Sequence, residues 1–148
     1  MIRAAVGAGV SLLATCSAVA VVRHRYTVIQ VEGTSMAPTF ADGDRLLVRR
    51  TRLDAVRRGE VVVFRTPPDY RAAPDTPPWL VKRAVAIPGD AVPADMRAAV
   101  GEGTEVPAAR LLVRGDNPRS LDSRNFGYVT TDGFRGVVVR RFGRSESC

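Results

Sequence analysis

Few side chains in this sequence can carry out acid–base or nucleophilic chemistry. Lys82 is the only lysine among 22 basic residues, and His24 is the only histidine. An arginine does not give up its proton in a protein, whereas a lysine that is shielded from water can. The single lysine is therefore a candidate for amine chemistry. The alternative is that this one lysine remains by chance, because the arginine-rich composition of the chain is typical of a GC-rich genome.

A candidate nucleophile lies at Ser35, where a predicted strand ends in a Gly-Thr-Ser turn that can present a hydroxyl to solvent. A serine in such a turn is more often only a turn residue, and its hydroxyl needs a base to become nucleophilic. His24 lies beside an apolar segment, Cys16 lies within that segment, and Cys148 is the last residue. The sequence therefore offers no Ser/His/Asp triad, no Cys/His catalytic pair and no Cys/His cluster with the spacing of a zinc site. Elimination leaves Lys82 as the base and indicates a Ser/Lys dyad.

The surroundings of Lys82 favour an uncharged amine. In a strand, side chains alternate between two faces, which places Ala84 and Ala86 beside Lys82 and Arg83 on the opposite face. Small apolar neighbours leave the amine poorly solvated, and desolvation lowers the pKa of a lysine toward neutrality. The alternative is a lysine that reaches solvent from a strand edge.

Short β-branched segments separated by Gly, Pro and Asp predict the elements that position these residues. The expected fold class is mainly β, with a short helical turn over Pro93–Val100 and a Pro-rich surface loop at 66–78. The predicted strands are Tyr26–Val31, Arg45–Arg49, Glu60–Arg65, Leu80–Ile87, Arg110–Arg114 and Gly136–Phe142. We expect this β-rich domain to cover residues 26–148.

The amino-terminal residues 1–25 form a predicted membrane anchor with its flanks. Residues 4–22 contain no charge and are long enough to cross a bilayer. An Ala-Val-Ala pattern at 18–20 leaves a cleavable signal peptide open, and a lipoprotein attached through Cys16 is a weaker alternative. Arg23 and Arg25, which follow this segment, slightly favour a membrane topology in which the carboxyl-terminal part of the chain is cytoplasmic.

Length and charge bound the function further. The chain has 148 residues, enough for one domain plus an appendage, and a net charge of +7. This charge permits contact with nucleic acid or anionic lipid. A basic nucleic-acid-binding barrel is disfavoured, because the arginines are scattered and no stacking aromatic motif accompanies them. The expected partner surface is the lipid bilayer, with no nucleic acid.

Three segments together resemble a known family. They are VEGTSMAPTF at 31–40, LVKRAVAIPGD at 80–90 and RGDNPRSLDSRNFGYV at 114–129. In this order, after an amino-terminal anchor, they resemble the boxes of the type I signal peptidases, which include the mitochondrial inner-membrane peptidases. The resemblance implies a coiled, largely antiparallel β-structure with one amino-terminal transmembrane helix, no metal and no cofactor.

The resemblance also implies roles for individual residues. Ser35 would be the nucleophile and Lys82 the general base, with the Ser120 hydroxyl orienting the amine. The remaining supporting residues would assist the oxyanion, shape the cleft or brace the wall of the site: Thr34, Met36, Asp116, Asp122 and Arg124. Gly33 departs from bacterial members that carry an oxyanion-assisting serine there, so the Ser35 N–H becomes the main donor. The large inserted domain of some bacterial members is also missing.

The implied function is a membrane-anchored serine endopeptidase that removes signal or leader peptides from exported precursors. The precursors would carry small residues at the first and third positions before the cut. The family also implies a single-pass protein of the cell membrane with an extracytoplasmic catalytic domain. The charges of Arg23 and Arg25 favour the opposite orientation, but only slightly. Three alternatives remain: a catalytically silent peptide-binding adaptor, a protease dedicated to a single precursor, and a self-cleaving repressor that here would lack its DNA-binding domain.

Overall fold

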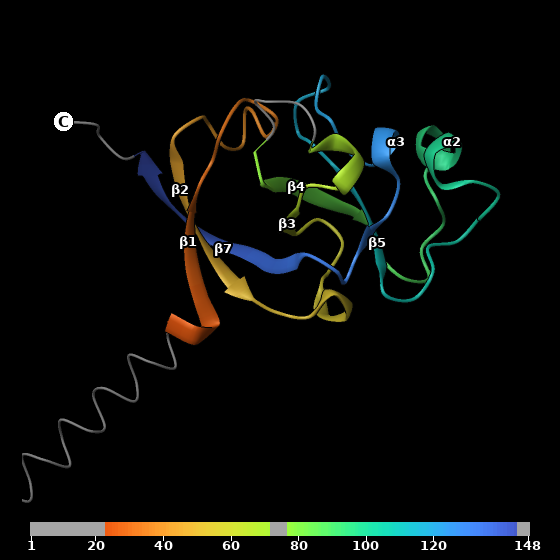
Figure 1. Cartoon of the computed structure of the whole chain (residues 1–148), viewed down its shortest axis with the longest axis horizontal. Coiled ribbons are helices and arrows are strands. Elements are labelled where there is room, and N and C mark those ends of the chain that lie inside the picture. Colours follow the sequence, from red (N-terminus) through yellow and green to blue (C-terminus); the bar gives the residue numbers. More distant parts are fainter. Residues whose placement is uncertain (1–22, 72–76, 145–148) are drawn as a thin grey trace, which may run out of the picture.

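A mainly antiparallel β-sheet forms the body of the protein (Figure 1). The computed structural model describes residues 23–71 and 77–144. Within them seven strands pair in the order β1-β2-β7-β3-β4-β5-β6. The strands are β1 Tyr26–Gln30, β2 Asp44–Arg50, β3 Val61–Arg65, β4 Trp79–Ala86, β5 Arg110–Arg114, β6 Val129–Thr130 and β7 Phe134–Arg144.

The long strand β7 holds the two halves of the sheet together. It pairs with β2 on one side and with β3 on the other, and bulges interrupt both ladders. Bulges bend a strand and increase its twist, so the sheet curves around its apolar face. Gly136 is needed at this crossing, because a Cβ there would lie 2.8 Å from the carbonyl carbon of Arg49.

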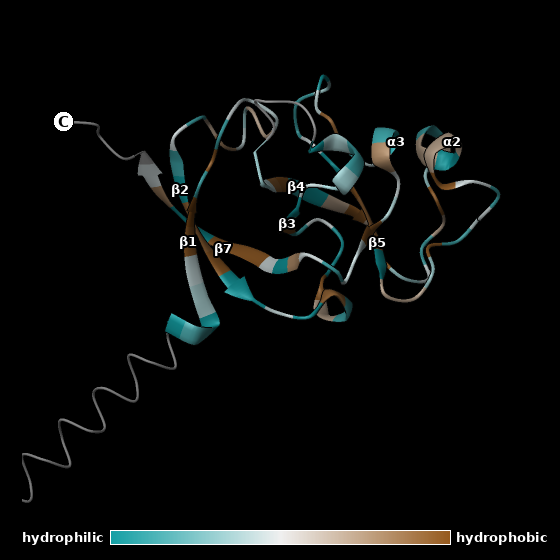
Figure 2. Ribbon diagram, in the orientation of Figure 1, coloured by the Kyte–Doolittle hydropathy of each residue, from teal (hydrophilic) through white to brown (hydrophobic). Residues whose placement is uncertain are grey.

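Three apolar clusters stabilise this curved sheet, and brown hydrophobic segments mark the inner strands in Figure 2. One cluster joins β3, β4 and β5 around Phe64 and Leu111. The second packs Met36 between β2, β3 and β4. The third surrounds Met96 between β5 and the segment that follows β4. Burial of these side chains removes apolar area from water and is the main stabilising contribution to such a fold.

The mainly β prediction and the six predicted strands are confirmed, with ends displaced by at most two residues and Arg110–Arg114 matched at both ends. The two-residue strand β6 is an addition, since it is too short to give an alternating pattern. The predicted helical turn after Pro93 is confirmed as η3 Ala94–Met96 followed by α2 Arg97–Val100. Sequence analysis missed η1 Leu53–Ala55, η2 Pro68–Tyr70 and α3 Ser123–Phe126.

The Pro-rich segment contains no strand among its described residues. Its two ends meet, because the Thr66 N–H donates to the Pro78 carbonyl at 3.0 Å and the Thr66 hydroxyl donates to the Pro77 carbonyl. Residues 72–76 lie outside the described part. So does the predicted membrane segment at 4–22, and the residues that the structure does describe contain no helix long and apolar enough to span a bilayer.

Candidate active site

A cavity of about 470 Å³ brings two of the three family-like segments together. One wall is formed by residues 29–35, at the end of β1 and in the turn that follows it. The other wall is formed by residues 77–82, at the start of β4. Leu121 adds a contact from the third segment. Ser35 and Lys82 are both among the residues that line this cavity.

The turn that carries Ser35 is fixed by its own backbone. The Ala37 N–H donates to the Thr34 carbonyl at 3.0 Å, and the Phe40 N–H donates to the Met36 carbonyl at 2.9 Å. The Met36 side chain is fully buried in the apolar cluster beneath the turn. Met36 is not among the described residues that line the cavity, and its side chain lies in the core cluster instead.

Gly33 adopts a backbone conformation that suits glycine. Its φ is +80°, and its N–H donates to Oδ1 of Asp42 at 2.7 Å. A Cβ at this position would meet nothing within 4 Å, so the cost of a side chain here is conformational. Ser35 itself is half-buried at the cavity, and Thr34 lies exposed beside it.

Lys82 lies on the buried face of β4, as the period of two predicts. The side chain is 1% exposed, the adjacent same-face residue Ala84 is fully buried, and Arg83 on the other face is half-buried. Burial lowers the pKa of the Lys82 ammonium from 10.5 to about 8, and the negative charge of Asp122 acts in the opposite direction. The ammonium therefore remains the major form at pH 7, and the neutral amine, roughly a tenth of the population there, becomes the major form above about pH 8.

Among the described residues, no carboxylate forms an ion pair with Lys82. Asp122, the acidic group that acts on its pKa, pairs instead with Arg124 at 2.9 Å. A buried amine without a counterion favours its uncharged form, which is the form that accepts a proton.

The third family-like segment contacts the Ser35 turn through its backbone. The Asn117 N–H donates to the Ser35 carbonyl, and Nδ2 of Asn117 donates to the Thr34 carbonyl, both at 3.1 Å. Gly115 allows this close approach. A Cβ on Gly115 would collide with the Ser120 side chain and would lie 2.6 Å from the Ser35 carbonyl oxygen. The serine turn, Gly115 and Ser120 are therefore in direct contact.

Ser120 is nearly buried, with 9% of its surface exposed. Its hydroxyl donates to the Leu121 carbonyl at 3.3 Å. The lone pairs of the hydroxyl oxygen consequently remain available to accept a hydrogen bond.

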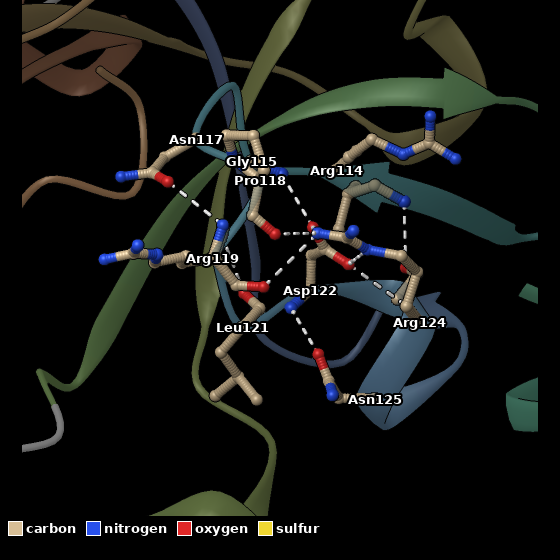
Figure 3. Close-up of polar contacts among 12 residues, drawn as sticks. Arg114, Gly115, Asn117, Pro118, Arg119, Leu121, Asp122, Arg124 and Asn125 are labelled. Carbon is tan, nitrogen blue, oxygen red and sulfur yellow. Dashed lines mark hydrogen bonds and ion pairs between the residues drawn. The ribbon is translucent and has the colours of Figure 1, made fainter. Parts of the chain in front are cut away.

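Asp122 and Arg124 stabilise the wall that carries Ser120 (Figure 3). The fully buried Asp122 carboxylate accepts hydrogen bonds from the Gly115 N–H and from two guanidinium nitrogens of Arg124. Burial opposes ionisation of Asp122, but these hydrogen bonds outweigh it and lower the pKa of the carboxyl. Asp122 also caps α3 in a capping box with Asn125. The same carboxylate therefore anchors both the Gly115 loop and the short helix.

Asp116 connects the serine turn to the lysine strand. Its carboxylate accepts hydrogen bonds from Nε and Nη2 of Arg83 at 2.9 and 2.6 Å, and from the Thr39 hydroxyl. The hydrogen bond from Arg83 holds the pKa of the Asp116 carboxyl below its usual range. Thr39 belongs to the turn after Ser35, and Arg83 follows Lys82. One carboxylate thus fixes the two segments relative to each other.

Sequence reasoning named Asp116 but missed three of the residues that act with the predicted set. These are Arg83, Thr39 and Asn117, which lie inside the quoted segments. Their partners are 33 to 83 positions away in the chain, so no local pattern pairs them. The position of Arg83 next to the candidate lysine was the one sequence feature that could have pointed to these contacts.

Comparison with known proteins agrees with this arrangement. The family described as "Signal peptidase, peptidase S26" matches residues 4–100 and 93–142. Mitochondrial inner membrane protease subunit 1 of Schizosaccharomyces pombe is 32% identical over 125 residues, which cover 80% of this chain and 74% of the relative. Signal peptidase I V of Bacillus subtilis is 28% identical over 144 residues, covering 74% and 81%. Signal peptidase I of Bacillus caldolyticus is 28% identical, covering 76% of each.

The match includes all three family-like segments. The described fold brings the first two together at one cavity and holds the third against the serine turn through the Asn117 N–H. The chain therefore belongs to the type I signal peptidase family, peptidase S26.

Proposed function

We propose that this protein is a membrane-anchored serine endopeptidase that removes signal or leader peptides from exported precursors, with Ser35 as nucleophile and Lys82 as general base. The observation that carries the proposal is the shared cavity. A turn serine and a buried lysine without a counterion line the same space in a protein of a peptidase family. An uncharged amine beside an alcohol is the pair that nucleophilic catalysis without histidine requires.

The substrate would bind as an added strand between the two walls. Strand β1 is the edge of the sheet in the described chain, and residues 79–82 of β4 pair there with β3 alone. Both walls therefore offer free backbone groups toward the cavity. An extended peptide can pair with such edges through main-chain hydrogen bonds, which set its register. Apolar lining residues such as Val31, Leu80 and Leu121 suit small apolar side chains at the first and third positions before the cut.

The chemistry would proceed through an acyl-enzyme. Neutral Lys82 takes the Ser35 proton while Oγ attacks the carbonyl carbon of the scissile bond. The oxyanion accepts a hydrogen bond from the Ser35 N–H, with the Thr34 hydroxyl as a second donor in the absence of a serine at position 33. The lysine ammonium then protonates the leaving amine, and the C–N bond breaks. The neutral lysine next removes a proton from water as the water oxygen attacks the ester carbonyl carbon. The lysine ammonium then returns this proton to Oγ as the C–O bond breaks, which frees Ser35 and leaves the lysine neutral.

Ser120 would position the amine for these transfers. Its hydroxyl donates to the Leu121 carbonyl, so its oxygen can accept an N–H of Lys82 and leave the nitrogen lone pair directed at Ser35. Asp122, Arg124 and Asp116 would act indirectly, because they hold the Ser120 wall and the serine turn in place.

We further propose that residues 4–22 anchor the protein in the cell membrane with the catalytic domain on the extracytoplasmic side. Precursors held at the same membrane would then meet the site at a high effective concentration. Both a general role in the processing of secreted proteins and a role dedicated to one precursor are compatible with this site. Alkaline phosphatase fused to the carboxyl end should be active in cells, and an inactive fusion would contradict the orientation.

The test is cleavage of a precursor by the full chain in detergent, with amino-terminal sequencing of the product. The wild-type protein should release a leader after small residues, whereas Ser35→Ala and Lys82→Arg should retain the fold and lose cleavage. Arg110→Gln, on the exposed start of β5, is the matched control and should cleave normally. Binding of the precursor without any cleavage by the wild type would favour the silent adaptor, and full activity of either site variant would refute the dyad.

A further inference from the structure

Glu32 is an acidic residue on the wall of the candidate cleft. Among the cavity-lining residues that the structure describes, only Glu32 and Lys82 are charged. Glu32 is exposed, and the ion pairs among residues 23–71 and 77–144 do not include it. It does not act as a counterion of the lysine, because Asp122 is the carboxylate that acts on the pKa of Lys82. The described part of the chain therefore supplies no cation for the Glu32 carboxylate.

Strand alternation decides on which face of the first wall Glu32 lies. Side chains of an extended segment point alternately to two faces. Ile29 and Val31 pack into the second apolar cluster, which also contains Val81 of the other wall. Gln30 and Glu32 are exposed and also line the cavity. They therefore share the face that points away from this apolar cluster.

The backbone of the same segment turns Gln30 and Glu32 toward a bound peptide. The Val31 N–H donates to the Asp44 carbonyl at 2.8 Å, and the Val31 carbonyl accepts from the Gly43 N–H at 2.9 Å. Along a strand, the backbone groups of successive residues point alternately to the two neighbouring strands. Because Val31 bonds toward β2, the backbone groups of Gln30 and Glu32 point to the free edge of β1. An added strand would therefore pair with these two residues.

The faces also define which substrate side chain meets Glu32. The first and third residues before the cut share one face of an extended peptide. Small apolar side chains there belong on the side of the apolar cluster, with Val31 and Val81. The second and fourth residues then point to the opposite face, where Gln30 and Glu32 lie. Side chains that share a face on neighbouring strands are about 5 Å apart, close enough for an ion pair.

The separation from Ser35 limits the position further. Glu32 precedes Ser35 by three positions, which span at most about 10 Å at about 3.3 Å per residue. An extended substrate with its scissile carbonyl at Ser35 covers that distance within four residues. The side chain beside Glu32 is therefore that of the second or the fourth residue before the cut.

We propose that Glu32 forms a subsite that selects precursors with a lysine or arginine at the second or fourth position before the cleavage site. The inference rests on the proposed peptidase function and adds a substrate preference to it. The net charge of +7 would by itself attract acidic peptides. A preference for a basic residue at one position therefore has to come from a local contact in the cleft.

The test uses synthetic peptides that are identical except for Lys, Gln or Glu at the second, third or fourth position before the cut. At one of the two even positions, the full-length protein in neutral detergent should cleave the Lys peptide with a kcat/KM roughly two- to fivefold above that of the Gln peptide. The Glu peptide should be cleaved more slowly still. Lys at the third position should reduce cleavage, because that side chain faces the apolar cluster. Added salt should weaken the preference, since the ion pair is exposed.

Two variants of Glu32 and a control separate the subsite from general effects. Glu32→Gln should cleave the Lys and Gln peptides at equal rates. Glu32→Lys should prefer the Glu peptide, a reversal that loss of folding cannot produce. The matched control is Glu102→Gln, which removes an exposed carboxylate that is not among the described residues of the cleft. It should keep the preference for Lys.

The variant Gln30→Glu tests the assigned face. It places a second carboxylate on the face of Glu32, two residues farther from Ser35. With the peptide set extended to the sixth position, it should add a preference for Lys two positions farther from the cut than that of the wild type. A gain at an odd position would show that the assigned face is wrong.

Equal cleavage of the Lys, Gln and Glu peptides at both even positions by the wild type would overturn the subsite and leave the peptidase function intact. A preference for Lys that persists in Glu32→Gln would also overturn it, because another group would then be responsible. Failure of the wild type to cleave any peptide would refute the proposed function itself.

Discussion

Replacing Lys82 with methionine should stabilise the folded protein at neutral pH and remove a defined part of its pH dependence. Methionine is unbranched, close to lysine in length and apolar, so it can fill the same space on the buried face of β4. The substitution removes the charge that burial destabilises. It should also abolish peptidase activity.

The magnitude follows from the pKa of the lysine. Its fall from 10.5 to about 8 corresponds to about 3 kcal/mol of unfavourable free energy for the buried ammonium. Below pH 8 both the folded and the unfolded chain carry the proton, so the wild type bears the whole cost. Between pH 8 and 10.5 the unfolded chain binds more protons than the folded chain, and the free energy of unfolding rises with pH. Above 10.5 both states are neutral and the cost is gone.

The assay is urea unfolding of the full chain in a nonionic detergent at several pH values, followed by the fluorescence of the single tryptophan. The free energy of unfolding of Lys82→Met minus that of the wild type should decrease by about 3 kcal/mol between pH 7 and pH 10.5. Taking this difference cancels the titration of groups that both proteins share. Ser35→Ala should retain the pH dependence of the wild type.

A difference that does not change with pH would refute the reasoning. It would mean that the lysine remains charged and hydrated in the folded protein, and that it cannot serve as a base near neutral pH.

Three further predictions concern the site. The kcat/KM of the wild type should rise with pH and level off above about 8, as Lys82 loses its proton, and a peptidase assay across pH 6 to 10 measures this. Gly115→Ala should lower the free energy of unfolding by about 2 kcal/mol or more and reduce activity, because its Cβ collides with Ser120 and lies 2.6 Å from the Ser35 carbonyl oxygen; urea unfolding checks it. Asp116→Asn should cost about 1 kcal/mol of stability and lower kcat with little change in KM, because Arg83 loses its carboxylate partner; unfolding and steady-state kinetics test both.

Local sequence patterns predicted the strands because turn residues bound each of them. The alternation along β4 also predicted the buried face of Lys82 correctly. Four short elements, β6, η1, η2 and α3, were missed, and the same physical reason applies to all of them. Strand β6 has two residues and α3 has four, so neither repeats a pattern often enough to be recognised. The capping box from Asp122 to Asn125 was the available signal for α3.

The supporting contacts of the site could not be predicted from local patterns, because they join distant segments. Asp116 binds Thr39 from 77 positions away, and Asn117 binds Thr34 from 83 positions away. The family resemblance identified Asp116 as a site residue, but it did not identify the residues that Asp116 and Asn117 contact. Their pairing depends on the tertiary approach that Gly115 permits, which only the folded chain reveals.

The uncharged amine is the central claim, and this chain allows it to be observed directly. Because Lys82 is the only lysine, labelling with 13Cε-lysine gives the protein a single side-chain signal to follow by NMR. The chemical shift of the folded wild type should titrate with a midpoint near pH 8. A midpoint near 10.5, the ordinary value for lysine, would contradict the account.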